Sequence, residues 1–155
     1  MESFYWKFLR VMGGLLGTRY QESPSLWYQC VAFAKQFALL QYGVKLGSFS
    51  WTAMNGWNTG SPFTDKRWKR IVYTKWLVPD AGDIVFFNVT AIDKAGHVAV
   101  ADGACTAISL SVDEQNALLG NGSGIGGDAI THRTVSYSGG GWRGNCVGWF
   151  HFNNV

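Results

Sequence analysis

Apolar positions in the first third of the chain recur with the spacing of an α-helix. One stripe consists of Phe4, Phe8, Val11 and Met12. A second stripe consists of Val31, Ala34, Phe37, Ala38 and Tyr42. The second stripe follows "SPS" (23–25), a helix-start signal, and precedes Gly43, which suits a helix C-terminus. We therefore predict two early helices, the second beginning near residues 27–29 and ending at Gly43.

After residue 83 the pattern changes to short apolar runs typical of β-strands, each bounded by Gly, Asp or Asn. The runs are "IVFFNV" (84–89), "HVAVAD" (97–102), "AISLSVDEQN" (107–116), "AITHRTVSY" (129–137) and "CVGWFHF" (146–152). Helices first and strands afterwards favour an α+β fold, with helices packed on an antiparallel sheet of about five to six strands. Glycine-rich stretches at 120–127 and 138–144 are predicted loops.

Residues 44–77 fit neither pattern well, apart from a short helix expected in "FSWTAMNGW" (49–57). Five of the thirteen basic residues lie close together in this region. They are Lys66, Arg67, Lys69, Arg70 and Lys75. This basic patch can contact an anionic polymer or form an ordinary solvated surface, and no accompanying motif points to nucleic acid as a partner.

The length and composition fit one compact domain. The chain has 155 residues, of which 47% are hydrophobic, and a net charge of +3. A chain of this size buries roughly two-thirds of its unfolded surface. Its apolar runs all fall short of the about 18 residues of a membrane span, so we expect no membrane insertion. The charged residues near the start leave no evident signal peptide.

Cysteine and histidine positions raise the question of chemistry. Three cysteines without a CxxC pair favour neither a structural zinc site nor a disulfide framework. Cys30 lies in the first turn of the predicted second helix, where free N–H groups and the helix dipole stabilise a thiolate. His97 follows the turn "DKAG" and opens a predicted strand, so its imidazole can serve as the base that activates a thiol.

The segment "DEQN" (113–116) offers a third member for such a site. Because side chains alternate along a strand, Glu114 and Asn116 share one face, and the other two residues share the opposite face. A hairpin closed near residues 103–106 would bring one of these pairs close to His97. On these residues alone, Cys30 can still be either a buried core thiol or a nucleophile.

Four segments, taken in order, resemble the CHAP domain, the cysteine, histidine-dependent amidohydrolase/peptidase family of the papain-like group. They are "YQCVAFAKQF" (28–37), "AGDIVFF" (81–87), "GHVAVADG" (96–103) and "VDEQN" (112–116). The terminal "CVGWFHF" resembles the closing strand of the family. The resemblance covers most of residues 26–152 and implies a papain-like fold. Residues 1–155 would then form a single catalytic domain, with a helical segment at 1–25 before a catalytic core at 26–155.

The resemblance also implies an activity, the hydrolysis of an amide bond in bacterial peptidoglycan. Cys30 would attack the carbonyl, His97 would transfer protons and Glu114 would orient the imidazole. The Gln29 side chain would help to bind the oxyanion, and Asn116 would line the site. We expect no cofactor or metal: some members bind calcium through aspartates near the cysteine, whereas the corresponding stretch here offers only Glu22.

Several kinds of protein are compatible with this chemistry. The first is a phage endolysin or virion-associated lysin, acting on the cell wall as N-acetylmuramoyl-L-alanine amidase or endopeptidase, outside the cytoplasm. A separate wall-binding domain or subunit would target it. The alternatives are a bacterial autolysin or secreted amidase toxin, a cysteine hydrolase with another substrate, and a non-catalytic wall-binding module of the same fold.

Eight tryptophans are more than a core of this size usually needs, so some are expected to line a substrate groove. Trp27 and Tyr28 are candidates because they immediately precede the cysteine motif. Trp57 is a candidate because "NGWNTG" (55–60) has the composition of a loop. The alternative for each is simple packing in the core. His132 and His151 lie in predicted strands far from the cysteine motif, so we expect structural roles for them.

Overall fold

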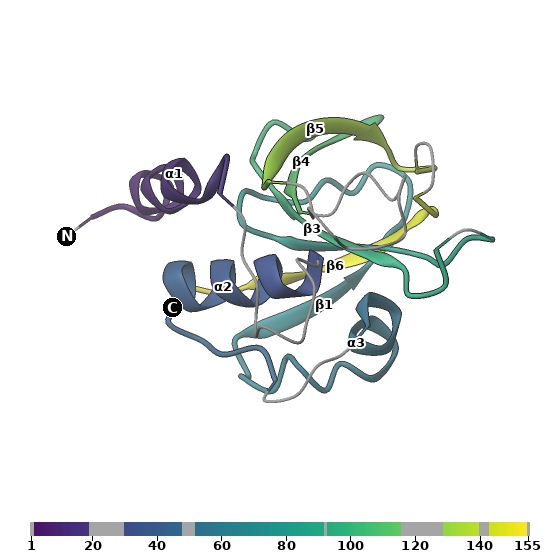
Figure 1. Cartoon of the computed structure of the whole chain (residues 1–155), viewed down its shortest axis with the longest axis horizontal. Coiled ribbons are helices and arrows are strands. Elements are labelled where there is room, and N and C mark those ends of the chain that lie inside the picture. The colour runs from purple at the N-terminus through teal and green to yellow at the C-terminus, as the bar shows by residue number, and fades with distance from the viewer. Residues whose placement is uncertain are drawn as a thin grey trace.

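The computed structural model describes residues 2–18, 30–47, 52–91, 93–115, 129–139 and 143–154. Three helices precede six strands (Figure 1). The helices are α1 (Phe4–Leu15), α2 (Cys30–Tyr42) and α3 (Ala53–Thr59). The strands are β1 (Trp68–Val72), β2 (Ile84–Phe87), β3 (His97–Ala101), β4 (Ser109–Glu114), β5 (Thr131–Ser136) and β6 (Cys146–Phe152). The α+β fold predicted from the order of the patterns is confirmed.

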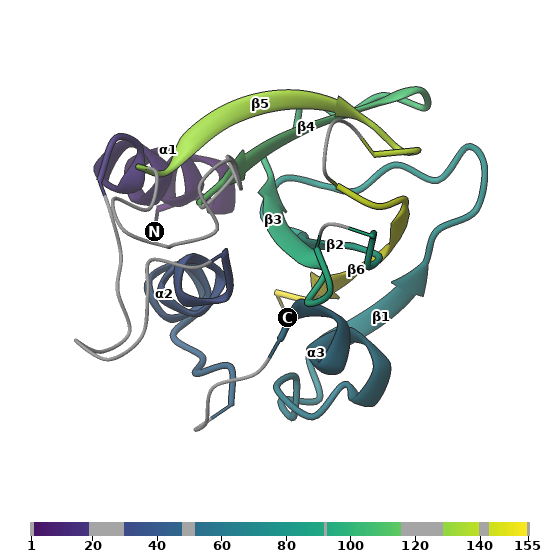
Figure 2. The same ribbon diagram turned by 45° about the vertical axis from the view of Figure 1, so that its right-hand side comes forward.

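All six strands form one antiparallel sheet in the order β1-β6-β2-β3-β4-β5. The predicted hairpin between the third and fourth strands is present, with Val100 opposite Asp113 and Ala101 opposite Val112. Figure 2 shows β4 and β5 curling over β2 and β6. Apolar side chains of these four strands fill the space inside the curl, among them Phe87, Leu110 and Trp149. The curled sheet therefore encloses a core of its own.

The first two helices pack beside the sheet through the predicted stripes. Phe8 of α1 meets Phe37 of α2 edge to face, with ring centroids 5.9 Å apart, and both lie in one core cluster with Val100 of β3. Burying an aromatic ring of this kind contributes about 1.5–3 kcal/mol. Gly43 follows α2 with a φ of 70°, the left-handed conformation that commonly ends a helix. The packing fixes the start of α2, and hence Cys30, relative to β3.

The structure adds one strand that the sequence pattern missed. β1 contains Lys69 and Arg70 of the basic patch and forms an edge of the sheet, with Trp68 facing the core and most other positions exposed. The Arg70 guanidinium lies 4.1 Å from the Trp57 ring centroid, so its charge covers an aromatic face. Charged side chains on the exposed face of an edge strand hide the alternation that would have identified it.

The described helices include none that is both long and apolar enough to cross a membrane.

Candidate active site

Three candidate functional residues lie at the ends of their elements. Cys30 is the first residue of α2, His97 is the first of β3 and Glu114 is the last of β4, and all three are buried. Continuing the β3–β4 pairing by one step puts Glu114 opposite Ala99, so Glu114 lies on the same face as His97 and diagonal to it. The sheet and the helix therefore bring together three residues that are separated by 84 positions of sequence, from 30 to 114.

The turn before β3 holds His97 in place. Gly96 has a φ of 71°, and a Cβ there would lie 2.7 Å from Cγ of Met54 and 2.8 Å from the backbone oxygen of Phe87. A residue with a side chain would therefore be both strained and crowded at this position. The N–H of Met54 donates to the carbonyl of Ala95 at 3.0 Å, so α3 also supports this turn.

The imidazole of His97 bonds both to the thiol group and to the carboxylate. Its Nε2 lies 2.7 Å from Oε2 of Glu114, and the Cys30 side chain forms a second hydrogen bond to the ring. Because Glu114 occupies Nε2, we assign the bond from Cys30 to Nδ1. A thiol, an imidazole and a carboxylate in this order can generate a nucleophile, hold the proton it releases and fix the orientation of the ring.

The charges around His97 favour its protonated form. Burial lowers the pKa of His97, but the negative charge and hydrogen bond of Cys30, together with those of Glu114, outweigh burial and raise the pKa to about 9. Near neutral pH this pKa favours the imidazolium form of His97, whose positive charge can stabilise a thiolate beside it. The thiolate is the nucleophilic form of cysteine.

Glu114 has cationic partners that were not anticipated from the sequence. Arg143 Nε donates to Oε2 of Glu114 at 3.1 Å, and Nη2 of the same guanidinium contacts Oε1. Arg133 Nε lies 3.2 Å from Oε1. Burial raises the pKa of Glu114, but the hydrogen bonds and charges of His97 and Arg143 outweigh it, so the pKa is lowered. The carboxylate is therefore ionised and held from two sides.

The structure does not test every residue predicted for the site. Gln29, Asn116, Trp27 and Tyr28 lie outside the described residues. So does most of the stretch before Cys30 on which the expected lack of calcium rests.

The prediction that Trp57 lies in a loop and lines a groove is wrong. Trp57 lies in α3, is 5% exposed and packs against Phe86 and Phe150, with ring centroids 5.7 and 5.6 Å away. Thr52 begins this helix by accepting a hydrogen bond from the N–H of Asn55 at 3.2 Å. The expected short helix is therefore present, and it points this tryptophan into the core.

The remaining histidines pair with aspartates in two groups that could hold a metal ion. His151 lies beside Asp80 and Asp83, and His132 lies beside Asp102 and Asp113. Neither group contains Cys30, His97 or Glu114. The structural role expected for both histidines is consistent with these contacts between strands.

Comparison with solved structures identifies the fold. Over 97% of this chain, the structure superposes on the wild-type endolysin LysIME-EF1 with a TM-score of 0.70 and 18% identity. Over 96% of the chain, it superposes on Ly7917 with a TM-score of 0.59 and 17% identity. A structure of Ly7917 with the hydrolyzing product of MDP gives a TM-score of 0.58 and 18% identity. This chain spans 64% of the length of the first of these proteins and 62% of the second. The fold is thus the α+β fold of endolysin structures.

The family follows from the sequence match. The CHAP domain model matches residues 19–116, which run from before α2 to the end of β4 and include the whole candidate triad. The chain belongs to the CHAP domain family. A search of curated proteins finds no match.

Proposed function

We propose that this protein is a cysteine hydrolase that cleaves an amide bond of bacterial peptidoglycan. Its membership of the CHAP family and its likeness to an endolysin support a peptidoglycan hydrolase. The observation that carries the cysteine mechanism is the position of His97, which bonds both to Cys30 and to Glu114. In this proposal residues 1–155 form one catalytic domain, and the protein is a phage endolysin or virion-associated lysin.

The reaction begins with Cys30 as thiolate and His97 as imidazolium. Sγ attacks the amide carbonyl, and the carbonyl oxygen becomes an oxyanion. When this intermediate collapses, the C–N bond breaks, the amine takes the proton of His97 and the acyl group stays on Cys30 as a thioester. A water molecule then attacks the thioester while neutral His97 takes one of its protons. The product acid leaves, and the thiolate–imidazolium pair is restored.

The oxyanion requires hydrogen-bond donors at the carbonyl oxygen. The backbone N–H of Cys30 lies at the start of a helix, where N–H groups have no partner within the helix. The Gln29 side chain is our candidate for a second donor. Glu114 contributes by holding His97 with its second nitrogen toward the sulfur and by stabilising the imidazolium.

Zymography on purified cell walls tests the cysteine mechanism. We expect clearing by the parent and by Cys105→Ala, and none by Cys30→Ala, with circular dichroism confirming that all three are folded. Cys105 is a matched control because it is also a free cysteine, and it bonds to Ser111 away from the triad. Equal clearing by the parent and Cys30→Ala, or clearing by neither, would refute cysteine catalysis and favour a non-catalytic wall-binding module or another substrate.

The bond that is cut can be identified by mass spectrometry of the digested wall. New peptide N-termini with intact lactyl amides would identify an endopeptidase. Free lactyl groups on muramic acid would instead identify an N-acetylmuramoyl-L-alanine amidase.

A further inference from the structure

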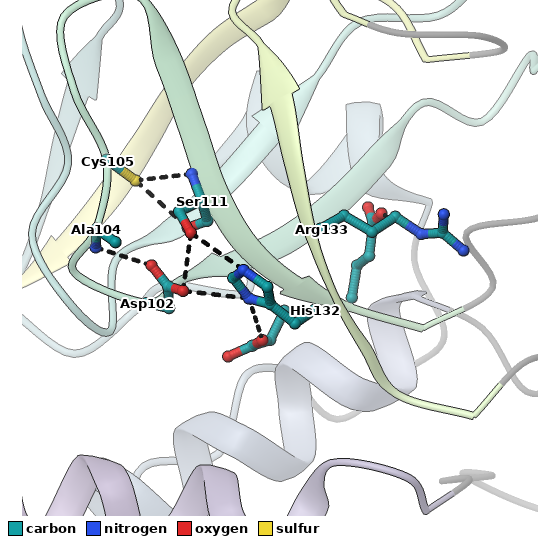
Figure 3. Close-up of polar contacts among 8 residues, drawn as sticks. Asp102, Ala104, Cys105, Ser111, His132 and Arg133 are labelled. Carbon is teal, nitrogen blue, oxygen red and sulfur yellow. Dashed lines mark hydrogen bonds and ion pairs between the residues drawn. The ribbon is translucent and has the colours of Figure 1, made fainter.

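A second group of ligating side chains joins three consecutive strands of the sheet (Figure 3). Asp102 directly follows β3, Asp113 lies in β4 and His132 lies in β5, where it pairs with Asp113. Side chains alternate along a strand, so Asp113 points to the face of β4 opposite Glu114. The group is therefore separate from the candidate triad.

The hydrogen bonds of Ser111 determine which nitrogen of His132 carries a proton. The Ser111 hydroxyl donates to Oδ2 of Asp102 at 2.9 Å, and its oxygen lies 3.3 Å from Nε2 of His132. A hydroxyl has one hydrogen, so the bond to the ring must use an N–H at Nε2. In the neutral imidazole this leaves a lone pair on Nδ1.

That lone pair faces two carboxylate oxygens. Nδ1 of His132 lies 3.1 Å from Oδ2 of Asp102 and 3.1 Å from Oδ1 of Asp113. Three electron-rich atoms at this separation repel one another unless a proton, on Nδ1 or on a carboxyl oxygen, or a metal ion lies between them. The fixed Nε2–H bond is also the arrangement usual for a metal-bound histidine, whose second nitrogen donates to a neighbouring group.

The spacing and accessibility of these atoms suit a metal ion. Ligand atoms about 2.0–2.2 Å from a zinc ion, at angles between octahedral and tetrahedral values, are about 2.8–3.6 Å apart. Both distances from Nδ1 fall in this range. The Asp113 side chain is 4% exposed and that of His132 is 48% exposed, so an ion can enter from solvent and meet a buried carboxylate.

We propose that Asp102, Asp113 and His132 bind a divalent transition-metal ion, with Zn²⁺ the ion they fit best and water completing its coordination. One nitrogen and two oxygens suit Zn²⁺, whereas Ca²⁺ takes six or more oxygens. Two carboxylates also neutralise the charge of the ion. The unfolded chain does not hold the three ligands together, so binding stabilises the packing of β3, β4 and β5. This site does not depend on the proposed hydrolase activity.

The other histidine and aspartate group provides a matched control. His151 Nδ1 lies 2.8 Å from Asp83 but 3.9 Å from Asp80, whose side chain is 81% exposed, so its ligands are less evenly placed. Zinc also binds thiolates, so the measurements use Cys30→Ala as the parent. Isothermal titration of the metal-free parent with Zn²⁺ should show one site. His132→Gln should weaken binding by at least about 100-fold, because even a group that only orients a ligand changes affinity about 10–100-fold. His151→Gln should leave it unchanged.

Two further measurements guard against misleading results. Circular dichroism must show that His132→Gln is folded, and Asp113→Asn should weaken Zn²⁺ binding in the same way. Co²⁺ should give visible absorption bands in the parent that disappear in both variants. Unchanged Zn²⁺ affinity in His132→Gln, loss of binding in His151→Gln instead, or no binding by the parent at millimolar Zn²⁺ would each overturn the proposal and leave a protonated His132 between two aspartates.

Discussion

Replacing Arg143 by glutamine removes a cation from a carboxylate that is shielded from solvent. The Glu114 side chain is fully buried and that of Arg143 is 7% exposed, so water cannot readily take the place of the guanidinium. Breaking a buried ion pair by removing one partner costs about 3–5 kcal/mol. Arg133 Nε, at 3.2 Å from Oε1, offsets part of this cost. We therefore expect the free energy of unfolding to fall by about 3 kcal/mol, out of the about 5–15 kcal/mol typical of a domain.

The same substitution changes the response to acid. A carboxyl group whose pKa is lowered on folding stabilises the protein above its unfolded pKa, and that contribution is lost as pH falls through the folded pKa. Arg143 is among the groups that lower the pKa of Glu114. Without it the pKa rises, so the variant should begin to unfold at a higher pH than the parent. Peptidoglycan hydrolysis should also fall, since a protonated Glu114 holds the imidazolium less well.

Urea denaturation at pH 7 and pH 5, followed by circular dichroism, measures both effects. Arg133→Gln is the matched control because its side chain is 34% exposed and makes one ion pair at this carboxylate, and we expect it to cost at most about 1 kcal/mol. Arg143→Lys keeps the charge but loses the forked contact, so its cost should lie between the two. An unfolding free energy for Arg143→Gln within about 0.5 kcal/mol of the parent would refute the reasoning.

Two further predictions follow from the triad and the core. Because the pKa of His97 is raised on folding, its contribution to stability is fully present below the unfolded pKa of about 6.5 and is lost as pH rises through about 9. Both stability and wall lysis should therefore decline across that interval. A decline in stability at alkaline pH that is identical in Cys30→Ser would contradict the thiolate–imidazolium pair. Trp57→Ala should lower the free energy of unfolding by about 3–5 kcal/mol because it empties a core position. Trp76→Ala removes a side chain that is 69% exposed and should change the free energy of unfolding little. A larger loss of stability in Trp76→Ala than in Trp57→Ala would contradict the core position of Trp57 and favour its groove-lining role.

The sequence predicted those parts of the site that local patterns encode. Helical spacing located α2, and strand alternation with a glycine turn located the β3–β4 hairpin. Because residues on one face of a strand are two apart, alternation alone left both Glu114 and Asp113 possible, and the choice of Glu114 came from the family resemblance. The observed register, with Val100 opposite Asp113, puts Glu114 on the face of His97.

What the sequence did not predict depends on contacts between distant segments. Arg143 lies in a glycine-rich stretch without any period, and only its approach to a buried carboxylate gives it a role. The useful signal would have been the rule that a buried Glu needs a cation. The prediction for Trp57 failed for a different reason. The Asn and Gly residues around it resemble a turn, whereas the Thr52 cap and the core contacts favour a helix.

The cation that Arg133 supplies to Glu114 and the proposed metal site depend on one register of strand β5. Asp113 lies opposite His132, while Arg133, the next residue, points to the other face and reaches Glu114. A slip of one residue would turn His132 toward the carboxylate of the triad and Arg133 toward Asp102 and Asp113. The contact of Arg133 with Glu114 and the metal-ligand group would then be lost together, and buried carboxylates on both faces of β4 would face the wrong partners. His132 and Arg133, on opposite faces of β5, therefore specify the pairing of an edge strand whose pattern of half-exposed residues would fix it only weakly.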